Sequence, residues 1–284
     1  MRVDVVLCTY NSNKPYFERC LRSVKREVPV NKLIVVDKFS EDGTLEVVRK
    51  IFPNALILRS RVNLAKAREL GISKVSTEYF VFVDDDIELP RGWFNTLLKY
   101  LDEGTGGIHG HAVPACDPLE KWFHWVKEVW EPRRLGGREV ITVTDNPDVI
   151  RGCTHNTLIK TEAVRDWKPP AMLSAFEDHH IARHVIKKGY SWKVVNTLTV
   201  KHYGVSSLRD CLRKAKWNSA GARLIKYDDW KAISLIRRTV LHTVKSLIAA
   251  RSLRDFRIPV YVSLTQVAYL IGYLRWDKYL TLKR

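Results

Sequence analysis

The stretch Tyr79-Phe80-Val81-Phe82-Val83-Asp84-Asp85-Asp86 decides how the rest of the chain is interpreted. Its first five residues are apolar and uncharged, which predicts a strand buried on both faces. Three carboxylates follow at once, and adjacent like charges repel one another unless a cation neutralises them. Hard oxygen ligands suit Mg²⁺ or Mn²⁺, so the run predicts a divalent-cation site at the strand end. A solvated surface loop is the alternative interpretation.

Apolar strand-like runs alternate with helix-like stretches upstream of this segment. The strand-like runs are 3–8, 33–36, 55–58 and 79–83, and the helix-like stretches are 17–24, 44–51 and 64–75. This alternation predicts βαβ units and an α/β fold with a Rossmann-like, mostly parallel sheet flanked by helices. Ligands bind at the carboxyl ends of the strands of such sheets. We therefore expect residues 9–11, Asp37 and residues 84–86 to meet at one edge.

The middle of the chain is less regular. Residues 108–113 are strand-like, and residues 121–130 hold four aromatic side chains at mixed helical spacing. These aromatic residues predict either a core helix or a lip over an acceptor site. Residues 133–149 are rich in Arg, Gly and Asp and are typical of a loop.

The charge of the chain is strongly positive and unevenly placed. The formal net charge is +17 over 284 residues, and residues 205–284 carry +12 of it. Such asymmetry favours a polyanionic partner, either nucleic acid or an anionic membrane face, with a well-solvated surface as the plainer alternative. No helix-turn-helix, zinc-finger or RNA-recognition signature is present, so a nucleic-acid partner is not expected.

The cysteine content bears on the cellular compartment of the protein, and the glutamine content bears on the growth temperature of its source organism. Five scattered cysteines lack CxxC spacing, which argues against a disulfide framework or zinc site and favours a reducing cytosol. The opening MRVDVVLCTYN enters a strand-like run directly, so no secretory signal is expected. Gln266 is the only glutamine, and low amide content with many charges is typical of a thermophile.

Several motifs, taken in order, resemble the family 2 glycosyltransferases. The similar segments are Val5 to Asn11, Val35-Val36-Asp37 with Gly43-Thr44, Asn63 with Ala67-Arg68 and Gly71-Ile72, the DxD-like Asp84-Asp85-Asp86, Arg151 to Thr154, and Phe176-Glu177-Asp178 with Arg183 and Gly189. The resemblance covers residues 3–204. Lys38 and Phe39 stand where the family usually has Asp and Gly.

The resemblance implies a GT-A fold and a role for each matching residue. Asp84 would contact the ribose, Asp86 would hold the metal, and His202 would be a further metal or diphosphate ligand. Asp178 would be the general base, with Glu177 beside it binding the acceptor. The residues expected to bind the donor are Thr9, Tyr10, Asn11, Asp37, Asn63, Arg68, Asp84 and Asp85.

The expected reaction is an inverting, metal-dependent transfer of a sugar from a nucleoside-diphosphate sugar, with UDP favoured over GDP. The polymerising Q-x-x-R-W motif is absent, which argues against a processive synthase. A nucleotidyltransferase is one alternative, but residues 9–13 contain no glycine for a phosphate loop. A basic nucleic-acid-binding protein is the other.

The basic tail predicts a membrane contact. Ile233, Ile236, Val240, Val244 and Leu247 follow helical spacing among basic residues, as in helices that lie on anionic lipid. Residues 258–274 are free of charge but include Pro259 and Gly272, which favours an interfacial or re-entrant helix over a span. Packing on the catalytic domain or on a twin subunit is the alternative.

These observations predict two parts. Residues 1–204 would be the catalytic domain, with a nucleotide-sugar half (1–104) and an acceptor half (105–204), and residues 205–284 a helical tail. The tail (231–284) would attach the chain peripherally or monotopically to the cytoplasmic face of a membrane. The acceptor would be a saccharide or a polyprenyl or other lipid-linked molecule. A homo-oligomer is a further expectation.

Overall fold

The computed structural model describes residues 1–130, 137–146, 151–227 and 232–281. It divides into two compact units. Unit 1 comprises residues 1–112, 139–171 and 177–202, and unit 2 comprises residues 113–138, 172–176 and 203–284. The predicted division at residue 204 stays a prediction, and unit 2 adds residues 113–138 and 172–176 to the predicted tail.

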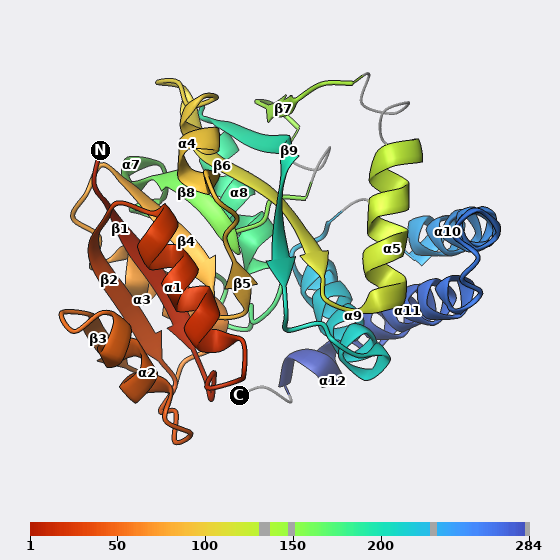
Figure 1. The fold of residues 1–284 in the computed structure, drawn as a ribbon, viewed down its shortest axis with the longest axis horizontal. Helices are drawn as coiled ribbons and strands as arrows, with labels where there is room; N and C mark the ends of the chain where they lie inside the picture. Colours follow the sequence, from red (N-terminus) through yellow and green to blue (C-terminus); the bar gives the residue numbers. More distant parts are fainter. Residues whose placement is uncertain (131–136, 147–150, 228–231, 282–284) are drawn as a thin grey trace. The chain divides into compact units, whose positions relative to one another are not determined.

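Unit 1 begins with a parallel sheet built from the expected strands (Figure 1). Strands β1 (Val3–Thr9), β2 (Val30–Asp37), β3 (Leu56–Arg59) and β4 (Tyr79–Asp84) lie in the order β3-β2-β1-β4, all parallel. Helices α1 (Phe17–Glu27), α2 (Thr44–Ile51) and α3 (Leu64–Ile72) connect them. The sequence prediction of these four strands and three helices is confirmed.

The second half of the sheet is antiparallel. Beyond β4 the order continues β8 (Asn156–Lys160), β6 (Thr105–Pro114), β9 (Ser191–His202) and β5 (Ile87–Glu88), and β7 (Val140–Val143) pairs with β9. Helices α4 (Trp93–Leu98), α7 (Thr161–Val164) and α8 (Glu177–Lys187) complete the unit. The loop predicted over 133–149 is therefore wrong at β7, whose apolar residues pair with a strand distant in sequence. Residues 133–136 and 147–149 of that loop lie outside the described residues.

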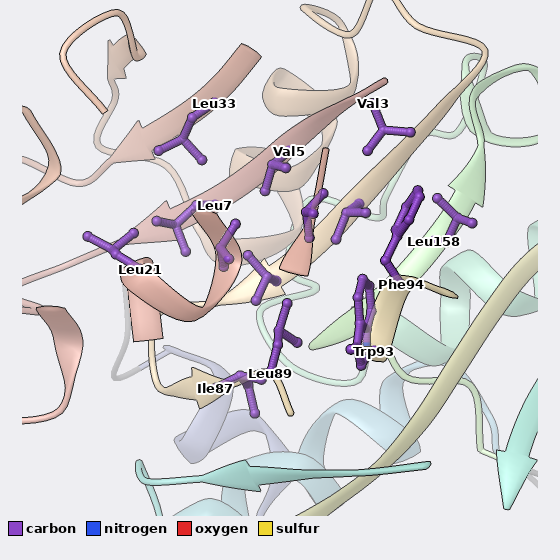
Figure 2. Packing of buried hydrophobic residues seen from close by; sticks show 14 of the residues in the cluster. Val3, Val5, Leu7, Leu21, Leu33, Ile87, Leu89, Trp93, Phe94 and Leu158 are labelled. Carbon is purple, nitrogen blue, oxygen red and sulfur yellow. The ribbon is translucent and has the colours of Figure 1, made fainter. Parts of the chain in front are cut away.

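Buried apolar side chains fill one face of this sheet. Figure 2 shows Val5 and Leu7 of β1 and Trp93 and Phe94 of α4 in one cluster of buried side chains. Trp93 is fully buried, and its indole Nε1 donates to Asn156 Oδ1 at 3.2 Å. This packing fixes the strand ends from which the polar residues of the site project.

Unit 2 is helical. It contains α5 (Asp117–Trp125), a π-helical turn η1 (Val126–Trp130), α9 (Leu208–Leu224), α10 (Ala232–Leu253), α11 (Arg257–Leu274) and α12 (Trp276–Thr281). Trp125 of α5 is buried against Ala249, Ile258 and Val262, so α5 contributes to a core, one of the two alternatives for this aromatic segment. The side chain of Trp130, residue 231 and residues 282–284 lie outside the described residues. Across the described residues, none of the helices is long and apolar enough to cross a membrane.

Candidate active site

The carboxyl ends of β1 and β2 meet in register. Thr9 pairs with Asp37 across the two strands, and the Thr9 hydroxyl donates to Asp37 Oδ1 at 2.9 Å. Asp37 is fully buried and also accepts from the backbone N–H and the hydroxyl of Ser40, at 2.9 and 2.6 Å. The expected meeting of these strand ends is confirmed. Ser40 is a partner that the sequence analysis missed, although it lies in the turn directly after the strand.

Residues 10–12 form the turn after β1. Tyr10 is 61% exposed, and the Lys38 ammonium lies 5.6 Å from the centre of its ring. Asn11 has a left-handed backbone (φ 49°), and its Oδ1 accepts from the Glu41 N–H at 3.0 Å. Ser12, also missed from sequence, donates its hydroxyl to Asp85 Oδ2. The turn is therefore tied to the acidic run.

The acidic run does not remain extended. Strand β4 ends at Asp84, and Asp85 and Asp86 form a turn before β5. An extended backbone would turn the side chains of Asp84 and Asp86 to one side of the strand, which the turn at Asp85 and Asp86 prevents. Instead the three carboxylates reach three partners: Asp84 meets Arg68, Asp85 meets Ser12, and Asp86 meets His202.

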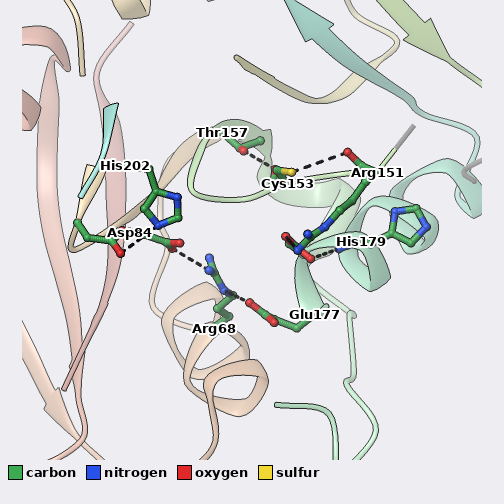
Figure 3. Close-up of polar contacts among 10 residues, drawn as sticks. Arg68, Asp84, Arg151, Cys153, Thr157, Glu177, His179 and His202 are labelled. Atoms are coloured by element: carbon green, nitrogen blue, oxygen red, sulfur yellow. Dashed lines mark hydrogen bonds and ion pairs between the residues drawn. The ribbon is translucent and has the colours of Figure 1, made fainter. Parts of the chain in front are cut away.

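Arg68 bridges two carboxylates inside unit 1 (Figure 3). It lies on α3 with 3% exposure; its Nη2 donates to Asp84 Oδ1 at 2.8 Å and its Nε to Glu177 Oε1 at 3.0 Å. Burial disfavours the charged guanidinium, but the two carboxylates outweigh this and raise the pKa of Arg68 above its ordinary value. Two nitrogens of its guanidinium group bind carboxylates, so the expected contact of Arg68 with the nucleotide stays a prediction.

Asp86 and His202 lie together because the next residue, Ile87, pairs with His202 between β5 and β9. His202 Nε2 lies 3.0 Å from Asp86 Oδ2. A carboxylate oxygen suits Mg²⁺ or Mn²⁺, whereas an imidazole nitrogen is the preferred ligand of softer divalent ions, so this pair fits a cation such as Mn²⁺ better than Mg²⁺. Within the described ranges no cluster of three or more His, Cys, Asp or Glu side chains could hold a metal alone. The remaining ligands would come from the substrate and water, as is usual for Mg²⁺.

The first turn of α8 carries the candidate base. Glu177 and Asp178 point to different partners, as expected for adjacent helical residues. Burial raises the pKa of Glu177 and the charge of Asp178 adds to the effect, whereas Arg68 opposes it. Asp178 Oδ2 accepts from Arg151 Nη2 at 2.9 Å, and its Oδ1 from the His179 N–H at 2.7 Å. Arg151 was noted in sequence only as part of a motif.

Two further histidines, the half-buried His155 and the buried His109, extend from the His202 side of the Asp86–His202 pair. The rings of His155 and His202 are nearly parallel with centroids 6.2 Å apart, and His109 lies 6.2 Å from His155. Trp192 lies 5.9 Å from His109. Burial lowers the pKa of His109 to about 4, so that ring is neutral at neutral pH. Nothing in the sequence marked His109, because it lies on an ordinary strand.

Asn63 has a local role. Its Oδ1 accepts from the Lys66 N–H at 3.0 Å and caps α3, and its Nδ2 donates to Ala171 O at 2.8 Å. Amide caps of this kind satisfy backbone groups left over at a helix start. A donor contact by Asn63 stays a prediction.

The two departures from the family pattern are both near Asp37. Phe39 has a left-handed backbone (φ 57°), and its ring lies 4.6 Å from the Arg59 guanidinium and 5.0 Å from that of Arg61. Arg59 Nε also lies 3.8 Å from Asp37 Oδ2. A cationic and aromatic cluster therefore replaces the small acidic turn that the family usually carries.

Three solved structures share the fold. A mannosyltransferase of Pyrobaculum calidifontis, determined with GDP-Man and Mn²⁺, has a TM-score of 0.57 at 18% identity and covers 99% of this chain and 72% of that one. Staphylococcus aureus TarS 1–349 has a TM-score of 0.52 at 14% identity, over 95% and 90% of the chains. GalNAc-T7 with UDP, GalNAc and Mn²⁺ has 0.52 at 15%, over 71% and 43%.

One curated relative matches in sequence. A Drosophila melanogaster protein named "Putative inactive polypeptide N-acetylgalactosaminyltransferase 12" is 38% identical over 77 residues. The match takes in 26% of this chain and 13% of that protein, so the chain spans only a small part of the relative's length.

The parallel strand edge, its acidic turn and the antiparallel half of the sheet have the fold of the GT-A glycosyltransferases. Residues 4–167 match glycosyl transferase family 2. The chain belongs to that family.

Proposed function

We propose that the chain is an inverting glycosyltransferase that moves a sugar from a nucleoside-diphosphate sugar to an acceptor with the help of Mg²⁺ or Mn²⁺. The observation that carries the proposal is the Asp86–His202 pair, which lies directly beyond the Asp84 end of β4. In an α/β sheet this is the edge at which ligands bind.

Asp86 and His202 would hold the cation, and Asp84 would contact the ribose. A bound cation supplies Lewis-acid stabilisation of the negative charge on the departing diphosphate. Asp85 keeps the turn in place through Ser12. Thr9, Tyr10, Asn11 and Asp37 would line the base side of the donor.

Asp178 would take the proton of an attacking hydroxyl. It is 9% exposed, and Arg151 holds one of its oxygens in a fixed direction. A carboxylate fixed in this way still has lone pairs for a hydroxyl proton within hydrogen-bond reach. Glu177 would orient the acceptor, and its ion pair with Arg68 would hold the Glu177 carboxylate in place.

The donor nucleotide is proposed to be UDP, with GDP as the second choice. The resemblance to the family supports UDP. Two fold neighbours were determined with GDP-Man and with UDP and GalNAc, which allows either nucleotide.

For the acceptor, the basic tail supports a lipid-linked molecule such as a polyprenyl phosphate at the cytoplasmic face of a membrane. A homo-oligomer and a thermophilic source remain predictions.

The proposal is tested with a panel of nucleotide sugars in the presence of Mn²⁺ or Mg²⁺, scoring donor binding and hydrolysis. At least one donor should bind and turn over, and chelation should stop it. Asp86→Ala should abolish metal-dependent donor binding, whereas the exposed Asp145→Ala should not. Absence of binding to every donor by the folded wild type would overturn the proposal.

Asp178→Asn separates two classes of acceptor. A hydroxyl acceptor must lose a proton, so its glycosylation should fall by about 10²–10⁴-fold while donor binding is kept. A phosphate acceptor is already ionised near neutral pH, so its glycosylation should persist. If Asp178→Asn loses donor binding to the same extent as transfer, the assigned role of Asp178 is wrong.

A further inference from the structure

Helices α10 and α11 turn apolar side chains outward. On α10 the large apolar residues of one face are exposed, from 39% at Leu253 to 62% at Val240. On α11 Val260 is 54% exposed, and Phe256 just before the helix is 77% exposed. Together the exposed apolar residues form what we call the outward face: Ile233, Ile236, Val240, Leu241, Val244, Leu247, Ile248, Leu253, Phe256, Val260, Leu264, Val267, Ile271 and Leu274.

Polar side chains instead lie between the two helices. Arg238 Nε donates to Gln266 Oε1 at 3.1 Å, and the Gln266 amide lies 3.3 Å from His242 Nδ1. Thr243 and Ser263 hydroxyls lie 3.1 Å apart across the same seam. Burial lowers the pKa of His242 to about 4, so the seam holds a neutral imidazole at neutral pH.

Other basic and hydroxyl side chains of α10 are also buried, while its apolar side chains are exposed. Lys245 is 8% exposed and Ser246 is fully buried, although both belong to a helix with exposed leucine, isoleucine and valine. Tyr269 also turns inward, with its ring 4.9 Å from the Arg238 guanidinium. Arg238 and Lys245 are two of the basic residues in the helix that the sequence predicts to lie on anionic lipid, and the structure turns both inward.

This distribution is the reverse of that in a helix pair surrounded by water. The outward face gathers fourteen exposed apolar side chains on two adjacent helices, whereas soluble monomers usually expose such side chains singly, and larger exposed apolar patches mark interaction sites. Helices that contact lipid commonly hold together through hydroxyl and amide side chains and small residues, because lipid tails give no hydrophobic drive for helix association. Gly272 fits this pattern, since a Cβ there would lie 2.1 Å from Lys216 O of α9.

Charges at the turn between the helices limit how this pair can meet a bilayer. Arg251 and Arg254 are exposed there, and Arg257 pairs with Asp255 and Asp117. Charged groups are costly inside hydrocarbon, so the turn cannot be the deepest point. We propose that α10 and α11 lie parallel to the membrane surface, with the outward face in the interfacial layer of an anionic bilayer.

A lipid surface fits this face better than a second copy of the chain. Neither α10 nor α11 contains an acidic residue, and the described exposed charges on them or at their ends include Arg237, Arg251, Arg254 and Arg275, all positive. A twofold interface would bring this positive set against itself, which is unfavourable. Anionic headgroups complement the same set.

The inference stands apart from the transfer reaction and is tested by lipid binding alone. The full chain is mixed with vesicles of phosphatidylcholine, with and without anionic phosphatidylglycerol, and recovered by flotation. The test variant carries Ile236→Ser, Val240→Ser, Val244→Ser and Leu247→Ser. The matched control carries Val129→Ser and Met172→Ser, two apolar residues of unit 2 that are each 39% exposed and lie outside the outward face.

The wild type and control should float with anionic vesicles, and the test variant should bind at least about tenfold more weakly, because burying one Val, Ile or Leu side chain is itself worth about a tenfold change in partition. A lipid with a photoreactive acyl chain should label peptides from 233–248. Light scattering without vesicles serves as the second measurement. A wild-type dimer that becomes monomeric in the test variant, with no vesicle binding by either, would overturn the proposal and identify the face as an interface between copies.

Donor binding by the same samples keeps the two proposals separate. A test variant that binds the donor like the wild type and fails to float supports the membrane proposal. Normal flotation of the test variant contradicts it, whatever the activity.

Discussion

His109 is a buried imidazole on β6 whose protonation would be costly. Its Nδ1 lies 2.8 Å from Gly110 O and so carries the hydrogen. Within the described part of the chain, its buried Nε2 has no hydrogen-bond partner. A proton on Nε2 would therefore place a charge in an apolar, aromatic setting beside Trp192.

This gives a pH dependence of stability with a defined sign. The pKa of His109 is about 4 in the folded chain against 6.5 in the unfolded chain, so the unfolded state takes up the proton first on acidification. Stability from this group is present above pH 6.5 and is lost as the pH falls towards 4, by up to about 3 kcal/mol. Urea unfolding of the wild type and His109→Gln across that window measures it. If both proteins lose stability equally, His109 is not responsible.

Arg68 is the residue whose removal should affect both stability and chemistry. Arg68→Met leaves Asp84 and Glu177 without their shared cation, and removing one partner of a buried pair costs about 3–5 kcal/mol. Arg68→Lys keeps the charge but cannot form both contacts, so we expect a smaller loss of stability and a clear loss of turnover. Thermal unfolding and donor hydrolysis of both variants are compared. If Arg68→Lys and Arg68→Met lose the same amount of stability and of turnover, the simultaneous contact of Arg68 with Asp84 and Glu177 has no role.

At the level of residues, the sequence identified the charged residues of the candidate site better than it identified the residues that bind to them in the fold. Asp37, Asp84, Asp86, Asp178 and His202 were selected because charged groups follow strands or match motifs. Their partners could not be found in the same way, since a partner such as Ser12 or Arg151 is defined by geometry that arises only on folding. The turn at the acidic run was missed for the same reason: three aspartates in a row do not reveal which of them ends the strand.

At the level of elements, close packing places α3 and therefore Arg68. A Cβ at Gly71 would lie 2.4 Å from Val6 Cγ1 of β1, so the helix rests on the strand without room for a methyl group. Glycine is used here for close approach, because its φ is in the ordinary range.

Gly71→Ala should consequently destabilise the chain by about 1–3 kcal/mol through overpacking and shift Arg68 away from Asp84. Gly104→Ala is the matched control, since a Cβ there would meet nothing nearer than Asp102 Oδ1 at 3.7 Å. Thermal unfolding and donor affinity are measured for both. A Gly71→Ala protein as stable as the control would mean that α3 can move without cost.

The first four strands and three helices could be predicted because each strand is apolar on both faces and each turn carries local signals. The antiparallel half could not. Within the described ranges its short strands β5 and β7 pair with β9 alone, which is distant in sequence, so their formation depends on tertiary contact rather than local pattern. The same holds for the polarity of α10, where helical spacing predicted the helix correctly but not that its basic residues Arg238 and Lys245 turn inward.

At the level of the whole molecule, the charge asymmetry and the outward face predict a mixed response to salt. Residues 205–284 carry +12, and raising NaCl from about 0.05 M to about 0.5 M shortens the Debye length severalfold. Vesicle flotation should therefore weaken but persist, because the apolar contribution is insensitive to screening. Complete release by salt would indicate a purely electrostatic contact, and no change at all would indicate that the basic residues take no part.

The Arg68 bridge also has a consequence for how the chain is made. Glu177 is 109 residues further along than Arg68, whereas Asp84 is 16 further. At a synthesis rate of about 5–20 residues per second, Arg68 is on the growing chain for on the order of 5–20 seconds before its second carboxylate exists. The parallel half can form on the ribosome during that interval, but the ion pair between Arg68 of α3 and Glu177 of α8 is necessarily a late event. A stalled or truncated chain that ends before residue 177 will thus have the fold of the donor half and a guanidinium that is only half neutralised.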